Sequence, residues 1–124
     1  MAIIVYNRTK EDYSDRENNY PIYRPSILSN PYSHIKDKKT LAMFVVKSRE
    51  EAIERYKGYF DRMYNGNRPF KYLIDEIYEK YKNGETVYLE CFCHPLPCHG
   101  DIIEKKLKKR LIKELIANAK ERRK

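Results

Sequence analysis

Thiol and imidazole side chains are concentrated in one short segment near the C-terminal end of the chain. Residues 91–99 read Cys-Phe-Cys-His-Pro-Leu-Pro-Cys-His and contain all three cysteines and two of the three histidines of the 124-residue sequence. These side chains bind soft metal ions, or act as nucleophile and base near neutral pH. The segment is therefore the candidate functional site.

One interpretation of this segment is a zinc site with three thiolates and one imidazole. The ligands would be Cys91, Cys93, Cys98 and His99. The spacing argues against this set, because structural zinc motifs favour two ligand pairs, each separated by about two to four residues. Here the first pair is separated by a single residue and the second pair is adjacent. No cofactor is favoured, and zinc stays open as the metal that the residue types would suit.

A second interpretation makes the segment a reactive site. Cys98 and His99 precede an expected helix that opens at Gly100-Asp101, and the free amides and dipole of a helix N-terminus lower the pKa of a thiol and hold anions. Cys98 and His99 are then the candidate catalytic residues, with Cys93, Gly100 and Asp101 as candidate ligand contacts. In a third interpretation the thiols are small buried side chains around a rigid turn, and Asp101 complements the helix start.

The expected elements place this segment at the edge of a sheet. Residues 86–89 predict a strand that enters the segment, and the apolar run at residues 3–6 predicts a buried first strand that ends at Asn7. Because parallel strands end at the same edge of a sheet, we expect Asn7 to lie near the Cys/His segment.

Two helices are predicted between these strands. Residues 48–51 form a capping box that begins an amphipathic helix, which ends at Asn65-Gly66-Asn67. A second amphipathic pattern runs from Phe70 to Tyr81 and stops at Asn83-Gly84. Residues 41–46 are a candidate additional strand, whereas residues 9–40 are too rich in proline and polar residues for a long regular element.

This order of elements predicts one α/β domain over residues 1–124. We expect a small Rossmann-like sandwich with a short, mostly parallel sheet and a long basic C-terminal helix. No run approaches the roughly 18 apolar residues of a membrane span, and the N-terminus lacks the pattern of a signal peptide. The odd number of closely spaced cysteines argues for reduced thiols. We therefore expect a cytoplasmic protein that does not bind membranes.

The net charge of +8 lies in the C-terminal segment. Residues 105–124 contain ten Lys or Arg and two Glu, whereas residues 1–104 contain sixteen of each sign. We expect this basic helical tail to pack one apolar face, formed by Ile103, Leu107, Leu111, Leu115 and Ala119, with Ile112 and Ile116 beside it. Its candidate nucleic-acid contacts are Lys105, Lys108, Lys109 and Lys113; the alternative is a solvated face whose cations suit the helix dipole.

Three sequence blocks resemble the signature blocks of a known family. Residues 23–32 (Tyr-Arg-Pro-Ser-Ile-Leu-Ser-Asn-Pro-Tyr), residues 49–56 (Arg-Glu-Glu-Ala-Ile-Glu-Arg-Tyr) and residues 91–101, which end in Pro-Cys-His-Gly-Asp, look like those of the DUF4326 family in order and spacing. With Asn7, the resemblance covers roughly residues 3–107. It implies a small protein of bacteriophage or bacterial type and a set of site positions, but no established reaction. Tyr23 and Ser29 depart from the pattern, which often has glycine there.

The matched blocks complete the candidate site. Arg24 follows an extended segment and would present a fork of donors to a phosphate, while Ser26 and Asn30 belong to the same loop. One pocket should be lined by Asn7, Arg24, Asn30, Cys93, Cys98 and His99. Its expected ligand is a phosphorylated small molecule or nucleotide, and whether the protein is an enzyme is left open. The alternative is a non-enzymatic protein that contacts nucleic acid or a host defence protein, with the Cys/His turn as a structural or zinc staple.

Overall fold

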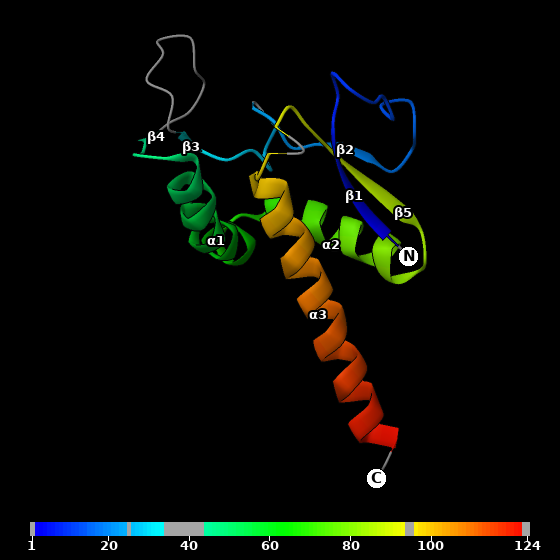
Figure 1. Ribbon diagram of the computed structural model, residues 1–124. Helices are drawn as coiled ribbons and strands as arrows, with labels where there is room; N and C mark the ends of the chain where they lie inside the picture. Colours follow the sequence, from blue (N-terminus) through cyan, green and yellow to red (C-terminus); the bar gives the residue numbers. More distant parts are fainter. Residues whose placement is uncertain (1, 25, 34–43, 94–95, 123–124) are drawn as a thin grey trace.

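The main sheet of the protein contains three parallel strands. The computed structural model describes residues 2–24, 26–33, 44–93 and 96–122 (Figure 1). The strands are ordered β1 (Ala2–Asn7), β5 (Thr86–Cys91) and β2 (Asn19–Pro21), so that β5 is central. A separate pair of short parallel strands consists of β3 (Tyr32–Ser33) and β4 (Phe44–Val45).

Within the described residues, three helices accompany these strands. They are α1 (Arg49–Gly66), α2 (Arg68–Lys82) and α3 (His99–Arg122), the last being the longest at 24 residues. The predicted α/β class, the short parallel sheet and the long final helix are confirmed.

The register of the main sheet brings the ends of its strands to one edge. Asn7 of β1 lies opposite Cys91 of β5, and Pro21 of β2 lies opposite Glu90. The segments that follow all three strands therefore leave the sheet on the same side, as expected from the sequence.

Two expectations about the strands need correction. Of the candidate strand at residues 41–46, the described part is Phe44–Val45, which pairs with β3 and not with the main sheet; residues 41–43 lie outside the described residues. The third strand of the main sheet is instead Asn19–Pro21, within a segment expected to be irregular. A proline is tolerated there because β2 is an edge strand and its last residue needs no ladder N–H.

The helix boundaries agree with the sequence signals. The Ser48 hydroxyl accepts a hydrogen bond from the Glu51 amide at 3.1 Å, and the Glu51 carboxylate accepts one from the Lys47 amide at 3.0 Å. Asn67 ends α1, and its side chain caps α2 by accepting from the Phe70 amide at 3.1 Å. After α2 the chain turns at Gly84, whose φ of 93° lies in the left-handed region.

The two faces of the main sheet are covered differently. Ile3 and Val87 lie with the buried residues of the three helices in a single apolar core. On the other face, Tyr13 from the loop after β1 stacks on Tyr88 with ring centroids 4.7 Å apart, and the Tyr6 hydroxyl lies 3.0 Å from the carboxylate of Glu90. The helices therefore pack on one face of the sheet and an aromatic loop packs on the other.

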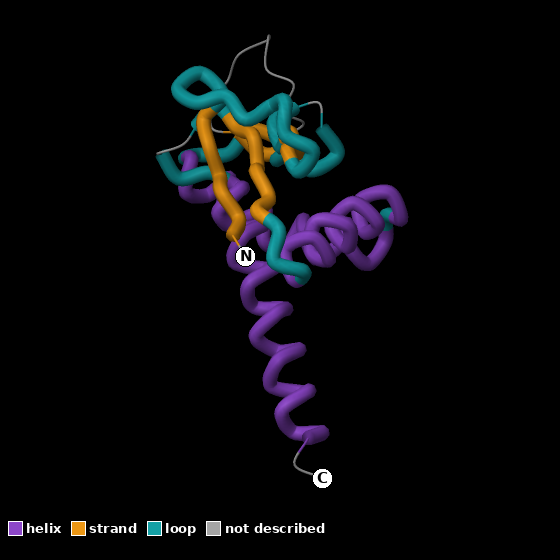
Figure 2. The backbone as a smooth tube through the Cα atoms, turned by 90° about the vertical axis from the view of Figure 1, so that its right-hand side faces the viewer, coloured by secondary structure: helices purple, strands orange, loops and turns teal. Residues whose placement is uncertain are grey.

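Helix α3 begins in the core and ends outside it, which corrects the expected apolar stripe. Leu107 and Leu111 are buried, whereas Leu115 is 57% exposed and Ala119 is exposed. The last turns of α3 extend away from the other elements (Figures 1 and 2), and no other described element covers Leu115 or Ala119. Among the described residues, no helix is both long enough and apolar enough to cross a membrane.

Candidate functional site

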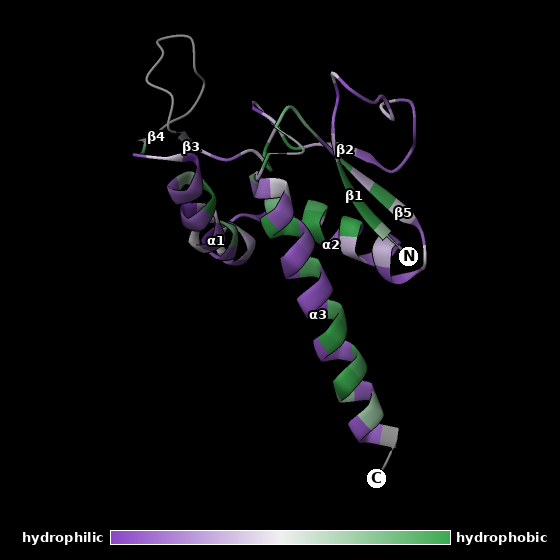
Figure 3. Cartoon of the chain, viewed as in Figure 1, coloured by the Kyte–Doolittle hydropathy of each residue, from purple (hydrophilic) through white to green (hydrophobic). Residues whose placement is uncertain are grey.

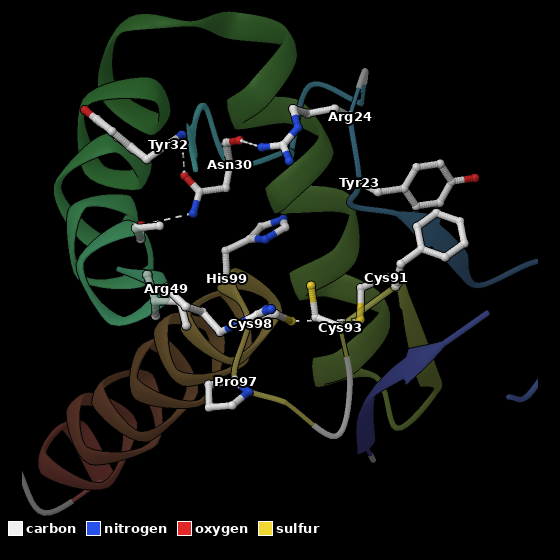
Figure 4. A pocket seen from close by; sticks show the side chains of 13 residues that line it. Tyr23, Arg24, Asn30, Tyr32, Arg49, Cys91, Cys93, Pro97, Cys98 and His99 are labelled. Atoms are coloured by element: carbon white, nitrogen blue, oxygen red, sulfur yellow. Dashed lines mark hydrogen bonds between the residues drawn. The ribbon is translucent and has the colours of Figure 1, made fainter. Parts of the chain in front are cut away.

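A cavity of about 200 Å³ lies at the carboxyl edge of the main sheet (Figure 4). Its walls come from three parts of the chain: the loop after β2, the segment after β5, and the first turns of α1. Five residues expected to share a pocket line this cavity, namely Arg24, Asn30, Cys93, Cys98 and His99. The strand-end geometry therefore brings the Arg-Pro-Ser loop onto the Cys/His segment.

Asn7 does not line the cavity, contrary to expectation. Its side-chain amide donates to the carbonyl of Phe92 at 3.1 Å, and its side-chain oxygen accepts from the amide and the hydroxyl of Thr9 at 2.9 and 2.7 Å. Because the side chain is buried and uses its polar atoms inside the protein, Asn7 joins the ends of β1 and β5 and closes a turn.

The loop that carries Arg24 is held by hydrogen bonds to its own backbone and to α1. Arg24 donates from Nη1 to the carbonyl of Asn30 at 2.8 Å. The side-chain amide of Asn30 in turn donates to the carbonyl of Ala52 at 3.0 Å, and the Tyr56 hydroxyl donates to the carbonyl of Leu28 at 2.8 Å. Ser26 contributes by accepting from the Leu28 amide at 3.1 Å, so it shapes the loop and does not line the cavity.

No left-handed residue is needed in this loop. Among the described non-glycine residues none has a positive φ. Tyr23 and Ser29, which depart from the pattern that the sequence blocks resemble, therefore adopt their conformations without a positive φ.

His99 lines the cavity as a neutral ring. Its Nε2 atom lies 2.6 Å from the carbonyl oxygen of Ile22, and because a carbonyl only accepts, this nitrogen carries the proton. The ring also contacts Tyr56 edge-on at a centroid distance of 4.9 Å. Burial lowers the pKa of His99 to about 4, and the nearby Arg24 guanidinium acts in the same direction. The imidazole is therefore uncharged near neutral pH.

Cys98 is not the activated thiol that the sequence suggested. Its Sγ lies 3.9 Å from the Sγ of Cys91 and accepts a hydrogen bond from the Gly100 amide at 3.3 Å. The contact with Cys91 and burial raise the pKa of Cys98, and together they outweigh the lowering effect of the Gly100 amide. The expected low pKa at the helix N-terminus is therefore wrong, because a second buried thiol lies beside the first.

The N-terminal turn of α3 is used for packing and capping. A Cβ atom on Gly100 would lie 2.8 Å from Cδ1 of Ile22 and 2.9 Å from Cγ1 of Val5, so any larger residue would force these side chains to shift where the helix meets the sheet. The Asp101 carboxylate accepts from the Cys98 amide at 3.2 Å, and the Asp101 amide donates to the Cys98 carbonyl at 3.1 Å. Gly100 and Asp101 lie outside the cavity lining, and the expected role of these amides in holding a ligand finds no support in this geometry.

The expected zinc ligands are only partly gathered. Cys91 and Cys98 are in contact, but the Nε2 atom of His99 faces a backbone carbonyl. Within the described part of the chain, no group of three or more His, Cys, Asp or Glu side chains is placed to hold a metal ion. His94 and Pro95 lie outside the described residues.

Several lining residues were not singled out from the sequence, and three of them bear on ligand binding. Arg49 is the first residue of α1, while Tyr23 and Phe92 pack against each other with ring centroids 4.6 Å apart. The sequence did contain a signal for Arg49. A cation at a helix N-terminus is unfavourable next to the positive end of the helix dipole, so its presence there indicates a role other than stabilising the helix. Tyr23 and Phe92 carried no such signal, since aromatic residues are usual in cores.

The cavity has an excess of positive charge. Its described lining contains Arg24 and Arg49 but neither Asp nor Glu, and neither arginine forms an ion pair within the described residues. A low-dielectric cleft of one sign concentrates counter-ions. The arrangement therefore suits an anionic ligand.

The four lysines expected to contact nucleic acid belong to a different surface. Lys105, Lys108, Lys109 and Lys113 are exposed on α3 and do not line the cavity. Any role they have is therefore separate from the cavity.

Most of the chain, including the cavity, matches the model of one protein family. Searches of curated proteins and of solved structures gave no match. The family model for a domain of unknown function, DUF4326, matches residues 5–109, a span that includes every described residue of the cavity lining. The chain therefore belongs to the DUF4326 family.

Proposed function

We propose that the cavity binds a phosphorylated small molecule, specifically a mononucleotide, and that the protein is a nucleotide-directed binding protein or enzyme. The observation that carries this proposal is the pair of arginines, Arg24 and Arg49, which line one cavity and have no carboxylate partner among the described residues. Unpaired guanidinium groups beside a cleft supply planar, charge-assisted donors for phosphate oxygens.

The two arginines reach the cavity from different elements. Arg24 lies on the loop after β2, where its bond to the Asn30 carbonyl uses Nη1 and leaves further guanidinium donors for a ligand. Arg49 stands at the N-terminus of α1, whose dipole adds positive potential. A phosphate between them would have a cation on each side.

The aromatic wall supports a ligand that also has a flat ring. Phe92 is 50% exposed and packs against Tyr23 at the cavity, so its ring can stack on a nucleobase. The volume of about 200 Å³ is below the roughly 300–1,000 Å³ typical of drug-sized ligands. A mononucleotide therefore suits the cavity better than a dinucleotide.

The chemistry available at the cavity centres on Cys93 instead of Cys98. Cys93 lines the cavity and is only partly buried, whereas Cys98 is 3% exposed and its pKa is raised. A buried neutral thiol is a poor nucleophile. If the protein forms a covalent intermediate, we assign the thiol to Cys93, and His99 contributes a neutral ring to the wall.

Calorimetric titration with the common nucleoside monophosphates, the matching nucleosides and inorganic phosphate tests this proposal. A mononucleotide should bind more tightly than its nucleoside. Arg24→Gln and Arg49→Gln should each weaken that binding by roughly tenfold or more, because a charge-assisted hydrogen bond contributes about 1.5–3 kcal/mol. Phe92→Ala should weaken mononucleotide binding but not phosphate binding.

Arg68→Gln is the matched control. Arg68 is the first residue of α2, as Arg49 is of α1, and it is exposed and does not line the cavity. Its substitution should leave binding unchanged. Absence of binding by every probe at millimolar concentration, or equal binding by the arginine variants and the wild type, would contradict the proposal.

A chromatographic assay of the bound nucleotide separates an enzyme from a binding protein. Conversion that is lost in Cys93→Ser while binding is retained would identify a thiol-dependent enzyme. Binding without conversion would leave a binding protein.

A second function, that of an interaction protein, is favoured by a separate observation. The distal half of α3 carries exposed apolar and basic residues that the cavity does not use. The bacteriophage-type origin and the cytoplasmic location stay predictions from the sequence.

A further inference from the structure

An apolar strip is exposed on the distal half of α3. It consists of Ile112, Leu115, Ile116 and Ala119, of which the first three are 57%, 57% and 51% exposed. These residues lie on the part of α3 that extends beyond the other elements (Figure 3). Three large apolar side chains exposed together on one helix mark a surface for contact with another molecule.

The strip faces away from the domain. On the side of α3 that meets the domain, Arg110 contacts Asp75 at 2.9 Å, and Glu114 accepts hydrogen bonds from Tyr78 and from Lys82. Ile112, Leu115 and Ile116 are spaced at i, i+3 and i+4, which places them on a different side of the helix. The domain therefore cannot cover the strip without releasing these contacts.

The strip continues toward the N-terminus as a basic surface. One heptad before Ile112, Leu115 and Ile116 stand Lys105, Lys108 and Lys109, all of which are exposed. Lys108 pairs with Glu104 of the same helix at 3.4 Å; Lys105 and Lys109 have no ion pair within the described residues. The outer side of α3 thus presents one seam, basic over residues 105–109 and apolar over residues 112–119.

We propose that this outer seam binds an acidic amphipathic helix of another protein. Ile112, Leu115 and Ala119 occupy the a and d positions of a heptad pattern, which pack into the holes of a facing helix. Lys105 and Lys108 occupy the preceding a and d positions, where carboxylates of the partner would pair with them. The partner helix is therefore apolar opposite residues 112–119 and acidic opposite residues 105–109.

Charge complementarity separates this occupant from a second copy of the chain. In a parallel pair of α3 helices, Lys105 and Lys108 would face their own counterparts. In an antiparallel pair aligned on the apolar strip, they would approach the C-terminal end of the other copy's α3, which is also basic and carries the exposed Lys120. Like charges disfavour both arrangements.

Two further occupants fit the seam less well. A nucleic acid would pair with the lysines but would gain nothing from three exposed aliphatic side chains. A helix that lies on a membrane carries its apolar and basic residues on opposite faces, whereas in this seam the basic part and the apolar part follow one another along the same side of α3.

Fluorescence anisotropy with designed peptides tests the proposal on the full chain. The probe is a helical peptide of roughly 21 residues with leucine at the a and d positions of one end and glutamate at those of the other. It is synthesised in both chain orders, to allow parallel and antiparallel pairing. One of the two orders should bind, and the matching peptide with lysine in place of glutamate should bind at least about tenfold more weakly.

Substitutions divide the seam into its two halves. The variant I112S/L115S/I116S should weaken binding of the acidic peptide by roughly tenfold or more, because exposed anchor side chains contribute most of such an interface. The variant K105E/K108E should lose the acidic peptide and gain the lysine peptide. The control A117S/N118S alters exposed residues of the same helix outside the seam and should bind the acidic peptide like the wild type.

Four outcomes would overturn the proposal. Two concern the peptide: the wild type and the triple serine variant bind it equally, or neither chain order binds at all. The third is self-association in sedimentation experiments that the triple serine variant abolishes. The fourth is preferential binding of anionic vesicles or of duplex DNA. None of these measurements involves the cavity, so failure here is independent of the proposed nucleotide site.

Discussion

Glu90 and Cys91 are neighbours on β5 that face opposite sides of the sheet. Their surroundings differ in whether the charged side chains there have partners of opposite charge. The Glu90 carboxylate is 1% exposed, yet it accepts hydrogen bonds from Tyr6 and Asn19, both at 3.0 Å, and lies 3.4 Å from Nη1 of Arg8. Burial alone would raise the pKa of Glu90, but these partners and the Tyr23 hydroxyl outweigh burial and lower it. The buried charge on this side of the sheet therefore has its partners within the chain.

The cavity beside Cys91 has the opposite character. Arg24 and Arg49 line it without an acidic partner among the described residues, whereas the arginine nearest Glu90, Arg8, is paired. A buried polar group whose partners are all in the chain stabilises the fold, while a charged group without a partner remains available to a ligand. The difference locates the candidate site on the helix side of the sheet.

Among the polar groups compared above, the largest expected effect is the loss of the Glu90 carboxylate. Glu90→Ala should lower the free energy of unfolding by about 2–4 kcal/mol, because the side-chain amide of Asn19 and the guanidinium of Arg8 lose their acceptor. Urea unfolding measures this loss. Glu79→Ala, an exposed position on α2, should change stability by less than about 0.5 kcal/mol. Equal stabilities of the two variants would mean that the hydrogen bonds to the Glu90 carboxylate do not stabilise the fold.

A smaller effect is expected from the pH dependence of His99. The unfolded chain takes up a proton as the pH falls through 6.5, whereas folded His99 does so only at about 4. Stability is therefore complete above the unfolded pKa and falls between these two values. The loss from pH 7.5 to 5.5 should be about 1–1.5 kcal/mol.

Urea unfolding of the wild type and of His99→Gln at both pH values measures this contribution. The variant should lack that part of the pH dependence, and the other two histidines are unchanged in both proteins. An identical pH dependence in the two proteins would show that His99 is not held neutral.

The comparison predicts different reactivities for the cysteines. Cys93 is partly exposed at the cavity, whereas Cys91 and Cys98 are 2% and 3% exposed. Iodoacetamide followed by peptide mass spectrometry should label Cys93 first in the native protein, by roughly tenfold or more in rate. A mononucleotide should slow that labelling if it occupies the cavity. Labelling of Cys98 ahead of Cys93, with and without a chelator, would restore Cys98 as the candidate reactive thiol.

The smallest expected effect lies at the exposed end of α3. Leu115→Ala should change the free energy of unfolding by less than about 0.5 kcal/mol, whereas Leu107→Ala should cost about 2–5 kcal/mol because Leu107 is buried in the core. A loss of more than 1 kcal/mol for Leu115→Ala, measured by urea unfolding and dependent on protein concentration, would point to self-association.

Local signals in the sequence determined most of the elements. The capping residues Ser48 and Asn67 and the turn at Gly84 set helix boundaries through contacts with residues close in sequence, and short apolar runs predicted β1 and β5. The sequence also predicted that the Arg24 loop lies over the Cys/His segment at the strand ends, although it did not reveal β2, the strand that precedes this loop. Strand β2 escaped detection because three residues that include a proline give no periodic signal.

Only the tertiary structure decided what each site residue does. The pKa of Cys98 depends on Cys91, seven positions away in sequence but in contact through the turn, and Asn7 uses its polar atoms on Phe92 across the sheet. Arg49 reaches the cavity because α1 packs beside it. Leu111 and Leu115 belong to the same apolar spacing in the sequence, but Leu111 is buried and Leu115 is exposed. They differ because burial requires a neighbouring element, and the extent of the neighbouring elements is a property of the whole fold.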